Sequence, residues 1–139
     1  MQGLRTANEM IMIQGSSPLQ MQKTAPTRAT AEKYVDDHLS LAMARTDAND
    51  MIYYLNASRN YNPAPKLGTI QAPVLWINSA DDFINPPELG IAQKMVGEMP
   101  RAKFILIPIS DATRGHGTHT VAAIWKDYLA EFIDRKSVV

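Results

Sequence analysis

The sequence predicts an α/β fold in which parallel strands with flanking helices follow a helical segment. Three observations predict it: two short apolar runs end in polar loops, an amphipathic segment follows each loop, and the stretch before them has helical periodicity. The central stretch is APVLWINSADDFINPP, residues 72–87, in which the apolar run 74–77 leads into a polar turn. Such a run, bounded by helix breakers, is typical of a strand buried on both faces of a parallel sheet.

Composition and charge argue against several classes of protein. The chain has 139 residues, of which 45% are hydrophobic and 20% charged, as is usual for one globular domain. Fourteen basic and 14 acidic residues cancel to a net charge of zero, so we expect no nucleic-acid partner. Because the sequence contains no cysteine, disulfides, a cysteine nucleophile and thiolate metal sites are excluded.

The N-terminal stretch carries no recognisable targeting signal. Its one apolar run, residues 10–13, is too short for the core of a signal peptide and too short to cross a bilayer. We therefore expect a cytoplasmic protein with no membrane partner.

Residues 1–65 are predicted to form a helical lid or cap segment. Helices are expected over residues 3–14, 30–45 and 47–60, with Asp47 as the N-cap of the third, and an exposed connection over 19–28. Six of the eight methionines fall in this segment. They suit either adaptable core filling or the pliable apolar lining of a lid over a pocket.

Residues 66–139 are predicted to form the α/β portion, after a proline-rich linker at 61–66. A strand at 74–77, a helix at 87–99, a strand at 104–107 and a final helix are expected in that order. Thr118 or Thr120 can cap the final helix, and Arg135 and Lys136 near its end suit the helix dipole. Its apolar side recurs at helical spacing through Val121, Ile124, Trp125, Tyr128, Leu129, Phe132 and Ile133.

Polar loops follow both predicted strands, and these loops hold the candidate site. Asp81 and Asp82 follow the first strand, and His116 follows the second. The carboxyl ends of parallel strands meet at one edge of a sheet, where open α/β folds bind ligands. A carboxylate on one imidazole nitrogen fixes the tautomer while the other nitrogen moves a proton. We predict the pair Asp82 and His116, preferring Asp82 because it lies deeper in the turn and four residues before Pro86.

Other interpretations of these residues stay open. Both carboxylates are also typical of residues that cap a turn or the next helix. His119 suits a helix-entry residue that bonds to the backbone. A metal site of His116, His119 and Asp82 is an alternative, although HxxH is a weak pattern. His38 is predicted to lie in the core or to line the lid.

Residues 66–134 resemble the C-terminal portion of the α/β-hydrolase fold. In that family an acid follows a late strand in the pattern D-x-x-x-P, and a Gly-His pair follows the last strand. Asp82 to Pro86 and Gly115-His116 match both patterns. Residues 47–63 resemble the lid end of the homoserine O-acetyltransferase branch. The resemblance implies acyl transfer or ester hydrolysis by a Ser-His-Asp mechanism, with an acyl-CoA as the suggested donor and no metal or redox cofactor.

The sequence departs from this family in two places. An Asp commonly follows the catalytic histidine of that branch and helps to hold homoserine, whereas Gly117 stands here. The nucleophile motif G-x-S-x-G is absent, and the nearest cluster, residues 15–18, lacks both the preceding strand and the second glycine. The resemblance therefore implies that this chain supplies Asp82 and His116, while the half of the hydrolase with the nucleophile is missing.

The expected partners follow from that gap. They are the missing N-terminal half of the hydrolase or a second copy of the chain, together with a small-molecule acyl donor and acceptor. Without a nucleophile the isolated chain is expected to be inactive. The alternative class is a non-catalytic interaction or assembly module, because half of a sheet exposes a strand edge and an apolar face.

Overall fold

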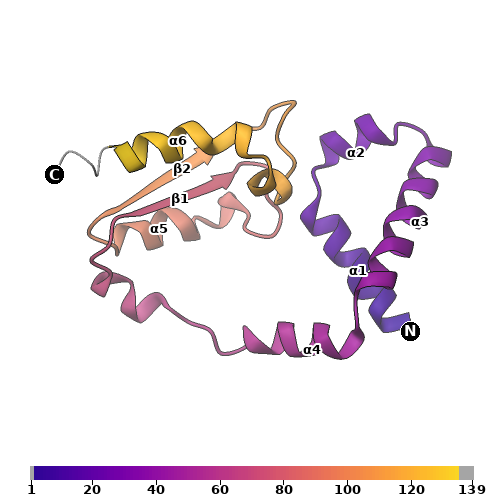
Figure 1. Ribbon diagram of the computed structural model, residues 1–139, viewed down its shortest axis with the longest axis horizontal. Helices are drawn as coiled ribbons and strands as arrows, with labels where there is room; N and C mark the ends of the chain where they lie inside the picture. The colour runs from indigo at the N-terminus through magenta and orange to yellow at the C-terminus, as the bar shows by residue number, and fades with distance from the viewer. Residues whose placement is uncertain (1, 135–139) are drawn as a thin grey trace.

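A computed structural model describes residues 2–134 of the chain. The fold is a mostly helical α/β arrangement in which helices flank a parallel sheet of two strands (Figure 1). The first half contains α1 (Gln2–Gly15), α2 (Pro18–Thr24), α3 (Arg28–Arg45) and α4 (Ala48–Ala57). The second half contains η1 (Ala64–Thr69), β1 (Val74–Ser79), η2 (Pro87–Leu89), α5 (Ile91–Gly97), β2 (Ala102–Ile107), η3 (Gly117–Thr120) and α6 (Ala122–Asp134).

The helices of the first half lie where the sequence predicts them, with one exception. The predicted helices over 3–14 and 30–45 are confirmed as α1 and α3. Asp47 caps α4 as predicted, since its side chain accepts from the N–H groups of Asn49 and Asp50. The stretch over 19–28 contains no buried residue, in line with the predicted exposure, but most of it forms the helix α2 and not a connection. Pro18 opens that helix, where its missing N–H costs nothing.

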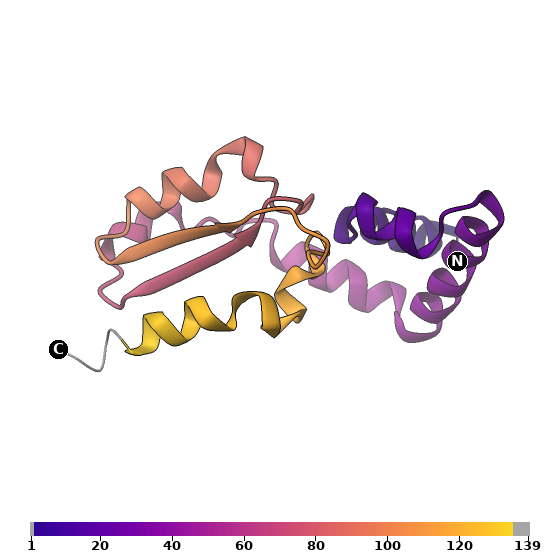
Figure 2. The same cartoon turned by 90° about the horizontal axis from the view of Figure 1, so that it is seen from above.

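The two strands form the centre of the second half. β1 and β2 pair in parallel, in register from Val74 opposite Ala102 to Ser79 opposite Ile107. Figure 2 shows α5 on one face of the strands and α6 on the other. Both predicted strands are therefore confirmed, each two residues longer than predicted, and the loops after them open at the same edge.

Three details of the second half differ from prediction. The helix expected over 87–99 is interrupted by Gly90 at φ +65°, which separates η2 from α5. Neither Thr118 nor Thr120 caps the final helix, because both belong to η3 and α6 begins only at Ala122. Arg135 and Lys136, which were predicted to suit the dipole of the final helix, lie outside the described residues. So do residue 1 of the predicted lid segment and residues 137–139 of the predicted α/β portion.

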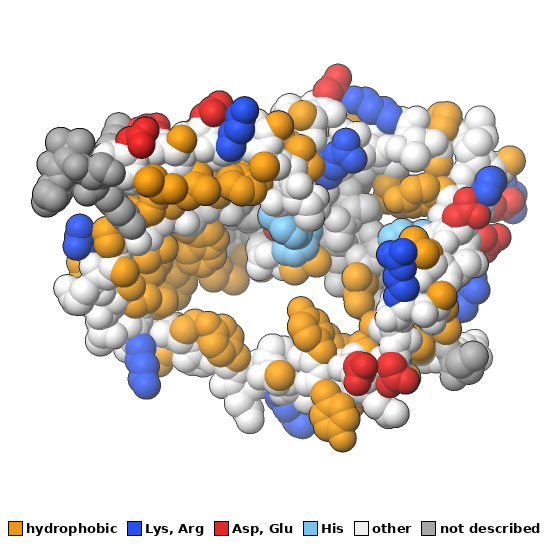
Figure 3. Space-filling model, in the orientation of Figure 1, with side chains coloured by type: hydrophobic (Ala, Val, Ile, Leu, Met, Phe, Trp, Pro, Cys, Tyr) orange, Lys and Arg blue, Asp and Glu red, His pale blue; other side chains and the backbone are white. Residues whose placement is uncertain are grey.

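The hydrophobic core is small. Within residues 2–134, the buried hydrophobic residues are Met12, Leu39, Ala92, Met99 and Ile107. The prediction that β1 is buried on both faces is wrong, since it is half-buried along most of its length. Within residues 2–134 its outer edge has no neighbouring strand, and no residue of α6 is buried. Figure 3 shows hydrophobic side chains gathered along α6 and around an opening bordered by α4.

None of the helices within residues 2–134 combines the length and the apolar character that crossing a bilayer requires.

Candidate functional site

The turn after β1 fixes the first predicted site residue, Asp82. Only 4% of its side chain is exposed. Its Oδ1 accepts hydrogen bonds from the N–H groups of Ile84, at 2.8 Å, and Asn85, at 3.0 Å. An aspartate that bonds to the backbone two and three residues later holds its own turn in shape. The capping role considered for Asp82 is thus present, and it leaves Oδ2 available to another partner.

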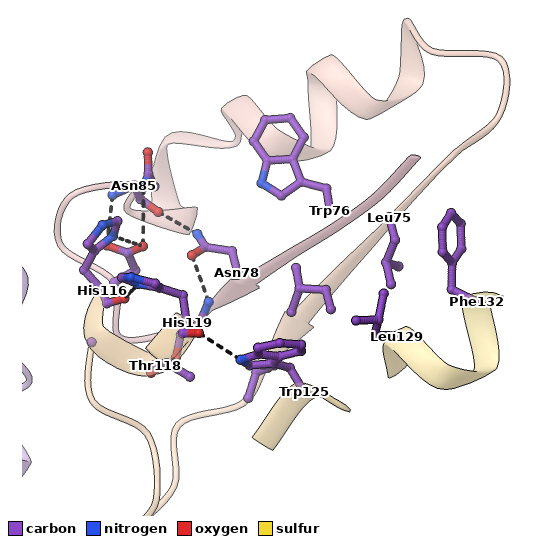
Figure 4. A pocket seen from close by; sticks show the side chains of 15 residues that line it. Leu75, Trp76, Asn78, Asn85, His116, Thr118, His119, Trp125, Leu129 and Phe132 are labelled. Atoms are coloured by element: carbon purple, nitrogen blue, oxygen red, sulfur yellow. Dashed lines mark hydrogen bonds and ion pairs between the residues drawn. The ribbon is translucent and has the colours of Figure 1, made fainter. Parts of the chain in front are cut away.

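That partner is the second predicted residue, His116. Its Nδ1 lies 3.0 Å from Asp82 Oδ2, so the structure brings the two predicted residues together (Figure 4). Because an ionised carboxylate only accepts, Nδ1 is the donor. The other nitrogen, Nε2, then holds a lone pair in the neutral ring, and no described residue bonds to it. With 36% of the side chain exposed, this nitrogen can meet a ligand.

Hydrogen bonds keep Asp82 ionised. Burial alone would raise the pKa of this carboxyl, but the bonds from the Asn85 N–H, the His116 ring and the Ile84 N–H together hold it below its usual value. A carboxylate with a lowered pKa remains negative at neutral pH. Asp82 can therefore stabilise a positive charge on the imidazole.

Asp81 belongs to the site in a different way. It is buried and accepts hydrogen bonds from the Ser79 hydroxyl and, at 3.0 Å, from the Gly115 N–H. Burial would raise its pKa, but these two bonds, with further ones from the hydroxyls of Ser17 and Thr113, lower it. Asp81 thereby joins the start of α2, the end of β1 and the loop of residues 113–120 that carries His116, called the histidine loop below.

Sequence reasoning missed this role of Asp81. It treated the residue as a rival of Asp82 or as a turn cap, because its partners in α2 and the histidine loop are distant in the sequence. The available signal was the doubled carboxylate itself. Adjacent residues at the end of a strand leave the backbone in different directions, so each of the two can serve its own set of partners.

The histidine loop depends on a glycine at position 115. Gly115 has φ +59°, and a Cβ added there would lie 2.5 Å from the Ser16 carbonyl oxygen. Side chains rarely adopt this conformation, and here none would fit. The close approach places the loop directly against the connection between α1 and α2.

His119 bonds to the backbone, as one alternative predicted. Its Nδ1 contacts the His116 carbonyl oxygen, and the two rings are 5.0 Å apart between centroids. Trp125 Nε1 in turn donates to the His119 carbonyl oxygen at 3.0 Å. The geometry gives the metal alternative no support, since residues 2–134 contain no group of three or more His, Asp or Glu side chains that could hold an ion.

His38 lies apart from this site. It is exposed, so the prediction of a core residue is wrong, and its ring stacks on Tyr34 at 6.2 Å between centroids. It lines a second cavity, on the opposite side of the histidine loop.

A cavity of about 600 Å³ opens over β1 and α6 beside the Asp82–His116 pair. Figure 4 shows a polar end, where the His116, Asn78 and Asn85 side chains gather, and an apolar wall from β1 and α6. The apolar lining is formed by Leu75, Trp125, Leu129 and Phe132 on the α6 side of β1, and by Trp76 on the α5 side. Such a cavity suits a ligand with one reactive polar group and an apolar remainder.

The arrangement can carry out one half of a nucleophilic reaction. A neutral His116 can take a proton at Nε2 while Asp82 stabilises the resulting imidazolium. No serine, threonine or tyrosine hydroxyl within residues 2–134 is bonded to Nε2, so the described chain places no nucleophile beside its base.

Comparison of the chain with models of protein families, with curated proteins and with solved structures gives no match. The site must therefore be interpreted from its own geometry.

Proposed function

We propose that this chain carries the acid and the base of a Ser-His-Asp site for acyl transfer or ester hydrolysis, in an α/β-hydrolase arrangement like that of the homoserine O-acetyltransferases. One observation carries the proposal. His116 is held through Nδ1 by an ionised Asp82, while its Nε2 is unpartnered within residues 2–134 and borders a large cavity.

The proposed reaction begins with a serine from the half of the hydrolase that lies outside this sequence. His116 Nε2 takes the serine proton as the oxygen attacks the carbonyl carbon of the acyl donor. The same nitrogen then returns the proton to the leaving group, and an acyl-serine forms. An alcohol or water attacks this ester, His116 takes its proton and gives it back to the serine, and the acyl group leaves on the new oxygen. Asp82 stays ionised throughout.

The missing groups are expected on a partner that extends the sheet. We propose that the partner supplies the serine, the donors that stabilise the oxyanion and a strand beside the outer edge of β1. The alternation of a parallel ladder leaves the backbone groups of Leu75 and Ile77 facing that edge. An acyl-CoA is the proposed donor and a small alcohol the proposed acceptor.

Native mass spectrometry tests whether such a partner exists. If the 15.4 kDa chain travels with a second, different polypeptide, that complex should react with a serine-directed fluorophosphonate and should turn over an acyl ester. The isolated chain should remain unlabelled. Labelling of one serine in the isolated chain would contradict the proposal that the nucleophile comes from elsewhere.

Variants of the complex test the roles of the two residues. Asp82→Asn should lower kcat by about 10⁴-fold and His116→Ala by about 10⁶-fold, as expected when a triad loses its acid or its base. Asp127→Asn on exposed α6 is the matched control and should leave kcat unchanged. Equal rates for Asp82→Asn and Asp127→Asn would exclude the proposed mechanism.

A second candidate function is that of a non-catalytic interaction module. The exposure of many large apolar side chains supports it, among them Tyr53, Tyr54, Leu55, Tyr61, Phe83 and Leu89. In that case His116→Ala should leave association with the partner unchanged and no complex should show esterase activity. The mass and activity measurements above therefore separate the two functions.

A further inference from the structure

A second cavity, of about 410 Å³, lies between the first three helices and the histidine loop. Residues from α1, α2 and α3 form one wall, and Arg114, Gly117 and Thr120 form the other. It is separate from the cavity beside the Asp82–His116 pair, but the same loop borders both.

The spacing of the loop residues explains how one loop borders two cavities. Arg114, Gly117 and Thr120 recur every three residues, the period of the 3₁₀ turn η3. Residues 115, 116, 118 and 119 lie between them and border the first cavity. A 3₁₀ turn places every third residue on one side, so the loop presents different side chains to each cavity.

The second cavity is lined by a positively charged side chain and by several polar groups that have no hydrogen-bond partner within residues 2–134. Arg114 is exposed, and its guanidinium has no partner among residues 2–134. No acidic residue within that range borders the cavity. The Tyr34 hydroxyl, the Thr24 hydroxyl and the His38 ring also lack hydrogen-bond partners in the described structure.

The remaining walls are apolar. Ile11, Met12 and Met21 line the cavity from the first two helices. Methionine side chains adapt to ligands of irregular shape. One fixed positive charge, several neutral polar groups and a pliable apolar wall together suit a small anion with a carbon skeleton.

We propose that this cavity binds a small organic carboxylate. A guanidinium presents two parallel N–H donors that match the two oxygens of a carboxylate. The hydroxyls of Tyr34 and Thr24 can donate further hydrogen bonds, and the carbon skeleton packs against the methionines. A phosphate dianion would be matched by only one fixed positive charge, so a carboxylate is favoured. The site does not depend on the acyl-transfer proposal, because it uses none of that site's catalytic groups.

Binding of butyrate to the chain, followed by NMR, tests the proposal directly. Saturable shifts of the Arg114 Nε–H signal and of the His38 ring signals are expected. Butyramide has the same shape without the charge and should bind at least about tenfold more weakly, since a hydrogen bond to an ionised group is stronger than one between neutral groups. Equal binding of the two compounds would overturn the proposal, as would the absence of saturable shifts.

Variants locate the site. Arg114→Gln should weaken butyrate binding at least about tenfold. Arg114→Lys keeps the positive charge but lacks the two parallel N–H donors of the guanidinium, and should bind butyrate with an intermediate affinity. Arg59→Gln, at an exposed position distant in the sequence, is the matched control and should bind as the unmodified chain does. Equal affinity of Arg114→Gln and Arg59→Gln would place any binding elsewhere and refute the assignment.

Two further measurements keep the test decisive. If Arg114→Gln fails to fold, as judged by its amide spectrum, Tyr34→Phe and Thr24→Val replace it and should each weaken butyrate binding severalfold. Inorganic phosphate is the competing probe. Tighter binding of phosphate than of butyrate at the same ionic strength would reject the carboxylate assignment.

Discussion

Two neighbouring carboxylates divide the work of the site between them. Asp82 Oδ2 contacts the His116 ring, and its Oδ1 holds the turn that follows β1. Asp81 contacts no ring but accepts from the Gly115 N–H, one residue before the histidine. Asp82 thus orients the imidazole, and Asp81 positions the loop that carries it.

Asp82→Asn should destabilise the protein in a pH-dependent manner. The carboxyl has a lower pKa in the folded protein than the value of about 3.9 expected in the unfolded chain. Its ionised form therefore contributes fully to the free energy of unfolding above about pH 4, and this contribution disappears as the pH falls through the pKa of the folded state. An asparagine cannot supply the charge. We expect Asp82→Asn to lose about 1–3 kcal/mol at pH 7 and less at pH 3, as measured by urea unfolding.

Asp127→Asn serves as the control for this measurement, because Asp127 is exposed on α6 and has no described partner. It should follow the unmodified chain at both pH values. A loss for Asp82→Asn that is the same at pH 7 and pH 3 would show that the charge is not what stabilises the turn.

At the scale of the elements, the α1–α2 connection and the histidine loop meet without a side chain between them. A Cβ at Gly115 would lie 2.5 Å from the Ser16 carbonyl oxygen and 3.2 Å from that of Asp81. Gln20 and Lys23 of α2 also contact Asp111, just before the loop, at 2.8 and 2.6 Å. The helical half is attached to the second half largely through this loop.

Gly115→Ala should therefore loosen the attachment. The added methyl group and the positive φ together should cost about 1–3 kcal/mol, measured by urea unfolding. Amide exchange should become faster in α2 and in the loop but not in β2. Gly117→Ala is the matched control, since its nearest neighbour would be Arg114 Cβ at 3.8 Å and its φ is ordinary. Equal stability of the two variants would contradict the close approach.

Local signals predicted most of the elements, and the failures come from ambiguous local signals or from contacts between distant segments. Asp47 marked the start of α4 because capping needs only the next three residues. The strands were predicted from short apolar runs. The break at Gly90 was missed because glycine also occurs within helices. The half-exposed state of β1 could not be predicted, since it depends on what lies beside the strand.

In the candidate site, too, residues with a local sequence signal were predicted and contacts between distant segments were not. Asp82 and His116 were predicted because both follow strands that were recognisable in the sequence. The contacts of Asp81 with Ser17 and Thr113 were not predictable, since they join segments distant in the chain. The cavity bordered by Arg114 is also not predictable, because the sequence indicates an exposed connection where α2 forms.

At the scale of the whole molecule, few side chains are buried and many large apolar ones are exposed. Leu39, with 1% of its surface exposed, is one of the few fully buried residues, whereas Tyr54 on α4 is 79% exposed. The stability of the chain therefore rests on a small set of contacts, and much of its apolar surface is available for association.

Leu39→Ala and Tyr54→Ser should separate the contribution of buried apolar residues to stability from that of exposed apolar residues to association. Leu39→Ala removes buried methyl groups and should cost about 2–5 kcal/mol in urea unfolding. Tyr54→Ser should change the free energy of unfolding by less than about 0.5 kcal/mol, and should reduce self-association in sedimentation. A large loss of stability for Tyr54→Ser would mean that α4 is packed more tightly than its exposure indicates.

The three-residue spacing of the histidine loop has a thermodynamic consequence. One short turn borders two cavities, so a ligand that shifts the turn from one side changes the shape presented on the other. If a ligand in one cavity changes the affinity of the other cavity for its own ligand by some factor, the second ligand must change the affinity for the first by the same factor.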